Sequence, residues 1–307
     1  MSNKRLEIQG LRKSLSGREI IKGIDLDLYE GEVLGLIGPN GAGKTTTIKM
    51  ITGLYRRDAG KIYYEGHDYD EDFIKIKKNI GAIVENPDLF PFLSGREHLK
   101  QVAILYPDIT DADIDRVAHL VKLDKALDKK VKQYSLGMKQ RLGIACMLLA
   151  KNNLLILDEP FNGLDPQGIR DLRKMLRDLA EQENISVMVS SHILSEVQSL
   201  CDRIAMINQG EIVAEQNISD ISLSLLDNNV RITTDDQKRL KEYFDERKIP
   251  SKIDKEFVII ACDLDNINQL LMDLMAADFK IYSIEPIHKN LEDVFIEIMQ
   301  EKGGEIL

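Results

Sequence analysis

Residues 134–165 read YSLGMKQRLGIACMLLAKNNLLILDEPFNGLD and are the most informative part of the chain. Within them, residues 142–150 are almost entirely apolar, as expected of a buried helix, and residues 154–157 read as a short buried strand. Two acidic residues, Asp158 and Glu159, follow the strand directly. Short apolar strands that alternate with helices indicate a parallel sheet covered on both faces, with functional side chains at the carboxyl ends of its strands.

A glycine-rich loop of the form GxxxxGK[ST] lies upstream, at residues 38–45 (GPNGAGKT). It follows an apolar strand at residues 33–37 and precedes a helical segment at residues 45–54, which is the setting of a phosphate-binding loop. Its glycines let backbone N–H groups converge on phosphate oxygens, and Lys44 is expected to bridge the terminal phosphates of a nucleotide. The hydroxyl of Thr45 is expected to bind Mg²⁺. The alternative, a glycine-rich turn with a chance lysine, does not explain the flanking strand and helix. The residues expected to hold the nucleotide are Gly38, Pro39, Asn40, Gly41, Ala42, Gly43, Lys44, Thr45 and Thr46.

The carboxylate pair has a chemical role that fits a phosphate loop. Asp158 can hold Mg²⁺, directly or through water, and Glu159 can take the proton from an attacking water molecule. The alternative is an acidic strand end that is simply solvated. The presence of the phosphate loop favours the catalytic interpretation.

The phosphate loop, the segment before the carboxylates and the carboxylates together resemble the ATP-binding cassette (ABC) ATPases in order and spacing. The signature of that family, LSGGQ followed by KQR, corresponds to residues 134–141, where Ser135 and Gly137 match. Leu136 replaces the first glycine, and Met138 replaces the glutamine. The resemblance implies that Ser135 and Gly137 of one copy contact the nucleotide on the phosphate loop of a second copy. From the residues alone, Ser135 would be read as an ordinary helix N-cap.

Two further roles follow from the resemblance. Residues 162–165 (NGLD), which end in Asp165, resemble the loop by which two subunits sense each other, and we expect Asp165 near the nucleotide. His192 follows the apolar strand at residues 185–190, where the family has a switch histidine that contacts the γ-phosphate. The expected catalytic residues are therefore Glu159, His192 and Lys44.

The chain departs from the family at two positions. In residues 80–87 (IGAIVENP), Glu85 stands where the family usually has a glutamine that touches Mg²⁺ and the membrane subunit. A carboxylate also ligates Mg²⁺, so Glu85 joins Thr45 and Asp158 as an expected metal ligand. This glutamate, together with residues 291–295 (LEDVF), resembles exporters of the bacitracin-resistance and lantibiotic-immunity group.

The second departure concerns the adenine base. Leu15 stands where many cassettes have an aromatic residue that stacks on adenine. An aliphatic contact lacks the ring–ring contribution of about 0.5–1.5 kcal/mol, so we expect modest nucleotide affinity with weak discrimination between bases.

Composition limits the possible partners. The net charge of −10 argues against nucleic acid, whose binding needs a basic surface. The first residues lack the apolar core of a secretory signal, and no apolar run reaches the length of a membrane span. Cys146, Cys201 and Cys262 lie far apart and are read as reduced core thiols. We therefore expect a cytoplasmic protein that is peripheral on the inner face of the membrane through its permease.

The expected fold is α/β and of the P-loop NTPase class, with a RecA-like parallel core sheet and antiparallel β and helical subdomains. Residues 1–216 are expected to form the ATPase domain and residues 217–307 a small C-terminal α/β domain. Within the helical part, Asp111 is expected to cap a helix at residues 113–122. Near the C-terminus, apolar residues Ile267, Leu270, Leu271 and Leu274 fall on one helical face.

The function expected from the resemblance is that of the ATPase subunit of an ABC transporter, with ATP and Mg²⁺ as cofactors. The resemblance to the bacitracin and lantibiotic group implies an exporter of the peptide antibiotic or drug resistance type. Two identical copies would close on two ATP molecules and move separate transmembrane permease subunits. One alternative is a soluble ABC ATPase that acts on nucleic acid or ribosomes. Another is a module that senses ATP without hydrolysing it.

Overall fold

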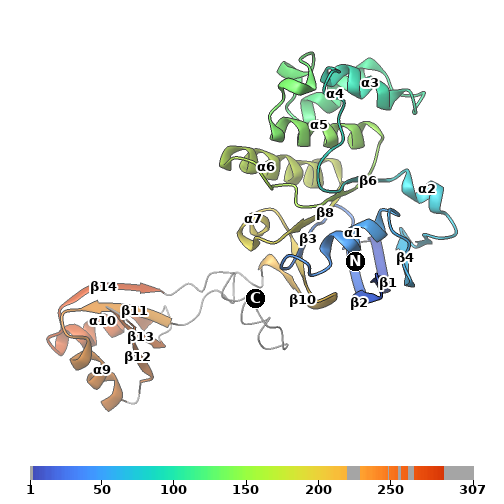
Figure 1. Cartoon of the computed structure of the whole chain (residues 1–307). Helices are drawn as coiled ribbons and strands as arrows, with labels where there is room; N and C mark the ends of the chain where they lie inside the picture. The colour runs from blue at the N-terminus through green and yellow to red at the C-terminus, as the bar shows by residue number, and fades with distance from the viewer. Residues whose placement is uncertain (1–2, 220–228, 248, 255–256, 262–265, 287–307) are drawn as a thin grey trace. The chain divides into compact units, whose positions relative to one another are not determined.

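The computed structural model describes residues 3–219, 229–247, 249–254, 257–261 and 266–286 (Figure 1). Of these, the residues up to Ile218 form one compact unit and those from Ser219 onward form another. The domain boundary expected between residues 216 and 217 stays a prediction. In this part of the chain, no helix combines the length and apolar character that crossing a bilayer requires. Residues 291–295 and Cys262 lie outside the described residues.

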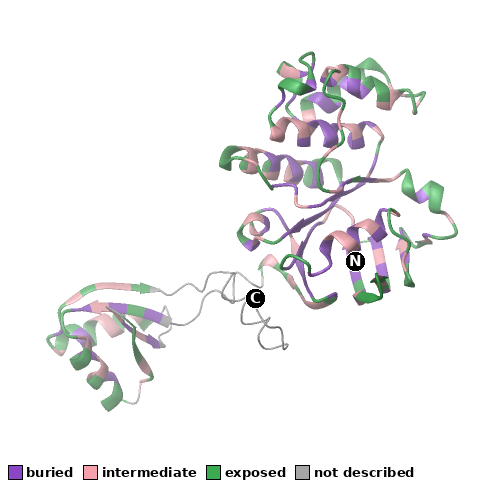
Figure 2. Ribbon diagram, viewed as in Figure 1, coloured by how far each residue is buried: buried purple, intermediate pink, exposed green. Residues whose placement is uncertain are grey.

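The first unit is built on a sheet with strand order β10-β9-β3-β8-β7-β6. Its strands are β3 (Val33–Ile37), β6 (Ile80–Ile83), β7 (Leu154–Leu157), β8 (Ser186–Ser191), β9 (Arg203–Asn208) and β10 (Glu211–Asn217). β3 pairs in parallel with β8 and β9, β7 pairs in parallel with β6 and β8, and β10 is antiparallel to β9. Every residue of β3, β7 and β8 is buried, so these strands are purple in Figure 2. The buried parallel strands predicted from the apolar runs are confirmed.

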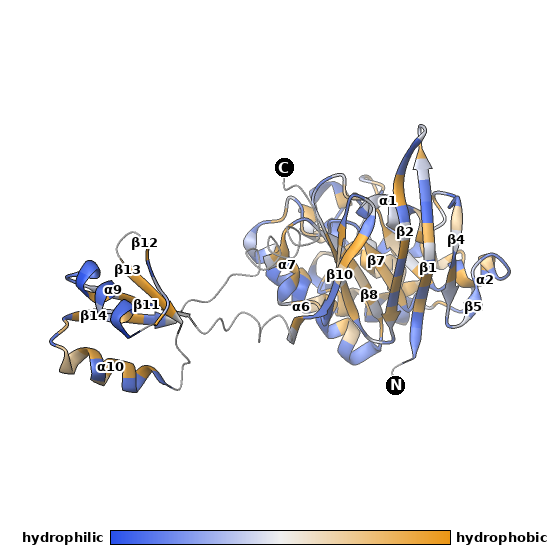
Figure 3. Cartoon of the chain, turned by 90° about the horizontal axis from the view of Figure 1, so that it is seen from below, coloured by the Kyte–Doolittle hydropathy of each residue, from blue (hydrophilic) through white to orange (hydrophobic). Residues whose placement is uncertain are grey.

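A second, antiparallel sheet in this unit has the strand order β2-β1-β4-β5. Its strands are β1 (Lys4–Leu15), β2 (Arg18–Tyr29), β4 (Ala59–Tyr64) and β5 (His67–Asp68), and helix α2 (Phe73–Lys77) follows them. Helix α1 (Lys44–Ile51) packs with both sheets, because its residues Ile48 and Met50 share one apolar cluster with Ile8 of β1 and Leu36 of β3. Figure 3 shows hydrophobic colour on the strands in the middle of the unit and hydrophilic colour on its outer helix faces.

The helices α3 (Gly95–Ala103), α4 (Asp111–Leu120) and α5 (Leu136–Leu149) contact one another and form a helical part of the same unit (Figure 1). The predicted N-cap at Asp111 is wrong. Thr110 caps α4, its hydroxyl accepting from the Asp113 N–H while the Asp113 carboxylate accepts from the Thr110 N–H at 2.8 Å. This reciprocal capping box satisfies two helix-end donors, which a cap at Asp111 would leave open. The other helical segments of this unit are η1 (Asp124–Ala126), η2 (Val131–Gln133), α6 (Pro166–Glu183) and α7 (Leu194–Gln198).

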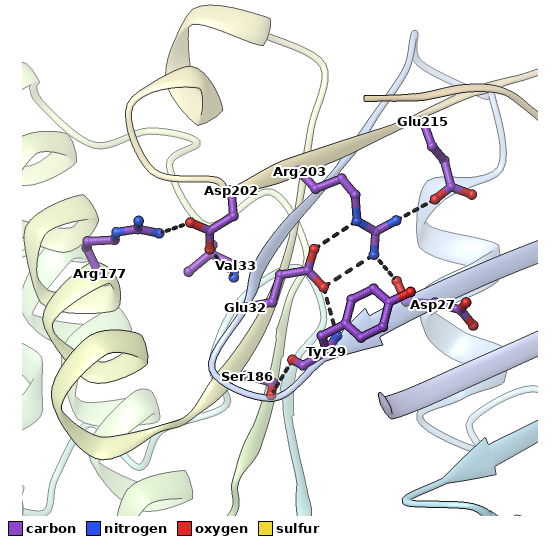
Figure 4. Close-up of polar contacts among 9 residues, drawn as sticks. All are labelled: Asp27, Tyr29, Glu32, Val33, Arg177, Ser186, Asp202, Arg203 and Glu215. Carbon is purple, nitrogen blue, oxygen red and sulfur yellow. Dashed lines mark hydrogen bonds and ion pairs between the residues drawn. The ribbon is translucent and has the colours of Figure 1, made fainter. Parts of the chain in front are cut away.

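In the first unit, a network of ion pairs connects residues at the amino-terminal ends of β3 and β9 with residues of β10 and α6 (Figure 4). The Arg203 guanidinium, at the start of β9, donates to Glu32 at 2.8 Å and also pairs with Glu215 of β10. Arg177 of α6 pairs with Asp202 at 2.7 Å. The side chain of Arg203 is mostly buried, so loss of a partner would leave a charge in a poorly solvated place. The network therefore stabilises the end of the sheet opposite to the carboxyl end of β7, which Asp158 and Glu159 follow.

The second unit is a sheet with strand order β12-β13-β11-β14, and all its pairings are antiparallel. In chain order its elements are β11 (Asn229–Thr234), α9 (Gln237–Glu246), β12 (Ser251–Asp254), β13 (Phe257–Ala261), α10 (Ile267–Ala276) and β14 (Ile281–Pro286). This βαββαβ order is that of a ferredoxin-like fold. Its core contains Val230, Ile232, Leu240, Phe244, Val258, Ile260, Leu274 and Phe279. The predicted apolar face of α10 is confirmed for Leu274, which is buried, and for Ile267 and Leu270, which pack against the core. Leu271, the fourth predicted residue, is half-buried.

Candidate active site

The phosphate loop leaves the buried strand β3 and turns into α1, as the sequence predicts. Gly41 and Gly43 have φ values of +82° and +113°, which residues with a Cβ adopt only at an energetic cost. Gly38 is required for space, because a Cβ there would lie 2.1 Å from the Ile207 carbonyl oxygen of β9. Nothing lies within 4 Å of a Cβ built on Gly41. The loop is therefore packed tightly on the sheet at its start and open at its centre.

The side chain of Lys44 is folded back onto its own loop. Its Nζ donates to the Gly38 carbonyl oxygen at 2.8 Å and to the Pro39 carbonyl oxygen at 3.2 Å. It also lies 3.3 Å from Oε1 of Glu159, and the side chain is only 6% exposed. A buried ammonium group needs such partners because leaving water is costly for a charge.

Glu159 joins two of the predicted catalytic residues. One carboxylate oxygen faces Lys44, and the other, Oε2, lies 2.9 Å from Nδ1 of His192. The backbone of Glu159 has φ of +48°, an uncommon value for a residue other than glycine, at the turn just after β7. The structure thus brings Lys44, Glu159 and His192 together in one cluster.

Asp158 is 2% exposed and lies at the end of β7, with its N–H donating to the Ile83 carbonyl oxygen of β6. A residue that sequence reasoning gave no role, Ser190 of β8, contacts both acidic residues. Its hydroxyl donates to Oδ1 of Asp158 at 2.6 Å and accepts from the Glu159 N–H at 2.8 Å. The available sequence signal was a pair of serines in an otherwise apolar strand just before His192.

The remaining predicted nucleotide and metal residues are distributed over several elements. Thr45 and Thr46 are half-buried in the first turn of α1, and Pro39 and Asn40 are exposed in the loop before it. Leu15 is half-buried at the end of β1, where it pairs with Arg18 across the hairpin.

Glu85 makes its ion pair with Lys49 of α1, at 3.2 Å, and its side chain is 70% exposed. The described residues contain no group of three or more His, Cys, Asp or Glu side chains arranged to hold a metal ion. The Thr45 hydroxyl and the Asp158 carboxylate are oxygen donors of the type that Mg²⁺ prefers, and Mg²⁺ in nucleotide sites often takes only one or two protein ligands. The donor chemistry of this site therefore fits Mg²⁺.

The predicted residues of the signature segment lie at helix starts. Ser135 is the N-cap of α5, and its hydroxyl accepts from the Met138 N–H at 3.3 Å. Gly137 follows in the first turn, where a Cβ would lie 3.5 Å from Cδ2 of Leu164. Asp165 is the N-cap of α6, and its carboxylate accepts from the Gly168 N–H at 2.8 Å. Helix N-termini carry free N–H groups and a partial positive charge, so the start of α5 is suited to an anion such as a phosphate.

The fold and the site define a P-loop nucleotide hydrolase with a mixed β core and a helical part. The family model for ABC transporters matches residues 21–162. The chain is 40% identical over 308 residues to YdbJ of Bacillus subtilis (strain 168), an ABC transporter ATP-binding protein, with 98% of each chain covered. The chain belongs to the ABC transporter ATP-binding proteins.

Relatives with named transport roles also match. The lantibiotic transport ATP-binding protein SrtF of Streptococcus pyogenes is 42% identical over 211 residues, which cover 69% of this chain and 90% of SrtF. The bacitracin transport ATP-binding protein BcrA of Enterococcus faecalis is 37% identical over 216 residues, which cover 70% of each chain. The resemblance to the bacitracin and lantibiotic group predicted from the sequence is confirmed.

Solved structures agree on the fold. The ATP-binding subunit of an ABC transporter superposes with a TM-score of 0.62 at 30% identity, covering 71% of this chain and 92% of the other. The dimeric, ADP- and Pi-bound cassette MJ0796 superposes with a TM-score of 0.62 at 22% identity, covering 69% of this chain and 98% of MJ0796. The protein is the ATP-binding and hydrolysing subunit of an ABC transporter, and the expected P-loop NTPase fold is confirmed.

Proposed function

We propose that this ATPase powers an exporter of peptide antibiotics or related drugs. The observation that supports this proposal is the similarity, at 37–42% identity, to proteins named for bacitracin and lantibiotic transport. The ATPase would act from the cytoplasmic face of the membrane, bound to separate transmembrane permease subunits. Transport would be coupled to closure and reopening of a pair of identical ATPase subunits.

In this proposal the phosphate loop and Lys44 hold the terminal phosphates of ATP. Lys44 would exchange the carbonyl oxygens of Gly38 and Pro39, and the Glu159 carboxylate, for phosphate oxygens. Thr45 and Asp158 would hold Mg²⁺, which supplies charge neutralisation on the phosphates when bound. The exchange leaves one carboxylate oxygen of Glu159 free to face a water molecule.

Glu159 is then the proposed general base, and such a residue typically contributes about 10²–10⁴-fold to a rate. Its second oxygen remains next to Nδ1 of His192, at 2.9 Å, which fixes the direction of the carboxylate. His192 would present its other ring nitrogen to the γ-phosphate. Proton transfer from water to Glu159 and attack on the γ-phosphate would release ADP and phosphate.

The second nucleotide face would come from another copy of the chain. Ser135 and Gly137 at the start of α5 would approach the γ-phosphate bound to the partner subunit, and Asp165 would lie at the same seam. The free N–H groups of this helix end support an anion-binding role. We also keep Leu15 as the proposed contact of the adenine base.

Glu85 is proposed to reach the metal site only after its ion pair with Lys49 opens.

Next to Glu85, a cavity of about 520 Å³ lies between β6 and the helical part, with apolar residues such as Val84 and Val102 in its lining. The large apolar side chains Leu54 and Phe90 are 59% and 54% exposed. Because exposed apolar side chains beside a cavity favour protein contact, this surface supports docking of a cytoplasmic segment of the permease.

Drug-sensitivity measurements test the proposal. Removal of the encoding gene from its host should lower the inhibitory concentration of bacitracin or of a lantibiotic, and the wild-type gene should restore it. A gene encoding Glu159→Gln should not restore resistance, although the variant protein accumulates normally. Unchanged sensitivity to both compounds after gene removal would reject the antibiotic-export proposal while leaving the ATPase family assignment intact.

A further inference from the structure

The hydroxyl of Ser190 occupies a position between the two acidic residues of the active site. Ser190 is fully buried, at 0% exposure, in β8, where it pairs with Leu36 of the strand that leads into the phosphate loop. Its Oγ lies 2.6 Å from Oδ1 of Asp158 and 2.8 Å from the backbone nitrogen of Glu159. One buried hydroxyl therefore contacts the side chain of the first acidic residue and the backbone of the second.

The direction of both hydrogen bonds follows from the chemistry of the groups. An ionised carboxylate only accepts hydrogen bonds, and a backbone N–H only donates them. The single hydroxyl proton of Ser190 must therefore point to Asp158, while an oxygen lone pair accepts from Glu159. Hydrogen bonds to charged groups are the stronger ones, so the Asp158 carboxylate is held in one orientation.

The contact to the backbone matters because of the conformation of Glu159. Its φ of +48° lies in the left-handed region, which disfavours a residue with a side chain by roughly 1–2 kcal/mol. From the neighbouring strand β8, the Ser190 hydroxyl accepts a hydrogen bond from the N–H of Glu159. In this conformation the Glu159 carboxylate reaches Lys44 on one side and His192 on the other.

We propose that Ser190 is a positioning residue for ATP hydrolysis. It orients the Asp158 carboxylate for the metal site and holds the backbone turn that aims Glu159 at the attacking water. This inference rests on the proposed roles of Asp158 and Glu159. In this role Ser190 acts through Asp158 and Glu159, which its hydroxyl contacts directly.

The two other buried serines of β8, Ser186 and Ser191, form hydrogen bonds with partners other than Asp158 and Glu159. The hydroxyl of Ser191 bonds to Glu196 at 2.9 Å and accepts from the Ile193 N–H, so it belongs to the turn before α7. The hydroxyl of Ser186, at the opposite end of the strand, donates to the Tyr29 carbonyl oxygen at 2.9 Å. Ser186 is also 0% exposed, which makes it the matched control for loss of a buried hydroxyl.

Steady-state ATPase kinetics of the full chain at saturating Mg²⁺ test the inference. Ser190→Ala should lower kcat by about 10–100-fold, the usual effect of removing a group that orients a metal or catalytic ligand. KM for ATP and the equilibrium affinity for ATP should stay close to wild type, because the phosphate loop is unchanged. Ser190→Thr, which keeps the hydroxyl, should recover most of the rate.

Controls separate positioning from general loss of stability. Ser186→Ala should lower the melting temperature and leave kcat unchanged, and the melting temperature of every variant is measured alongside. If Ser190→Thr does not fold, Ser190→Cys serves instead, since its weak S–H donor should give a kcat between those of wild type and Ser190→Ala.

The outcomes distinguish this inference from the proposed function. A wild-type kcat in Ser190→Ala, in a preparation where Glu159→Gln is inactive, overturns the role of Ser190 alone. An equal fall of kcat in Ser186→Ala and Ser190→Ala also overturns it, because both effects would then be structural. A wild-type kcat in Glu159→Gln overturns the proposed general base instead.

Discussion

Substitution of Gly38 by alanine is expected to damage the phosphate loop through a collision with the backbone of β9. A Cβ at this position would lie 2.1 Å from the Ile207 carbonyl oxygen and 3.0 Å from Ile207 Cγ2. A backbone carbonyl cannot rotate away as a side chain can, so the loop and β9 must separate. Overpacking of this kind costs about 3 kcal/mol. For a unit of this size, that loss lowers the melting temperature by roughly 6–12 °C.

Gly41→Ala is the matched control in the same loop. Nothing lies within 4 Å of a Cβ at Gly41, so only its φ of +82° opposes an alanine, at a cost of about 1 kcal/mol and roughly 2–4 °C. Calorimetry of both variants measures the two losses, and titration with ATP shows whether the displaced loop at Gly38 also loses affinity. Equal melting temperatures for the two variants, or wild-type ATP affinity in Gly38→Ala, would refute the steric argument.

Three other predictions follow from contacts in the same unit. Lys44→Ala should weaken ATP binding by about 10–100-fold, because it removes a charge-assisted hydrogen bond worth about 1.5–3 kcal/mol. Isothermal titration should show this loss, and an unchanged ATP affinity would contradict the role of Lys44. Lys49→Met should release Glu85 from its 3.2 Å ion pair and lower the Mg²⁺ concentration that half-saturates ATPase activity, whereas an unchanged Mg²⁺ requirement argues against Glu85 as a ligand. Burial lowers the pKa of His98, so the unfolded chain binds more protons than the folded one, and stability should be lost as pH falls below about 6.5. Melting temperatures at several pH values should show a smaller acid loss in His98→Gln than in wild type, and an equal acid loss would contradict this role of His98.

The central part of the fold could be predicted because its signals are local. Residues 154–157 are apolar throughout and end in two acidic residues, so both the strand and the position of Asp158 and Glu159 follow from the order of residues along the chain. The same holds for the strand–loop–helix around Lys44. The start of α4 shows the limit, because Thr110 and Asp113 form a reciprocal pair that outweighs the capping preference of a single Asp.

Contacts between strands could not be read from the sequence. The position of Ser190 between Asp158 and Glu159 depends on the parallel pairing of β7 with β8, which no spacing along the chain specifies. The ion pair of Glu85 with Lys49 likewise depends on how the turn after β6 meets α1. Family resemblance supplied the residue roles, whereas only three-dimensional structure supplied the partners that hold those residues.

The direct test of the account is the size of the Glu159→Gln protein when Mg²⁺ and ATP are saturating. Light scattering on a sizing column should give about twice the chain mass of 34.8 kDa, because two copies close on nucleotide that neither can hydrolyse. Adding Lys44→Ala to the same protein should return it to a single chain. A Glu159→Gln protein that binds ATP and yet elutes as one chain would contradict the shared-site mechanism.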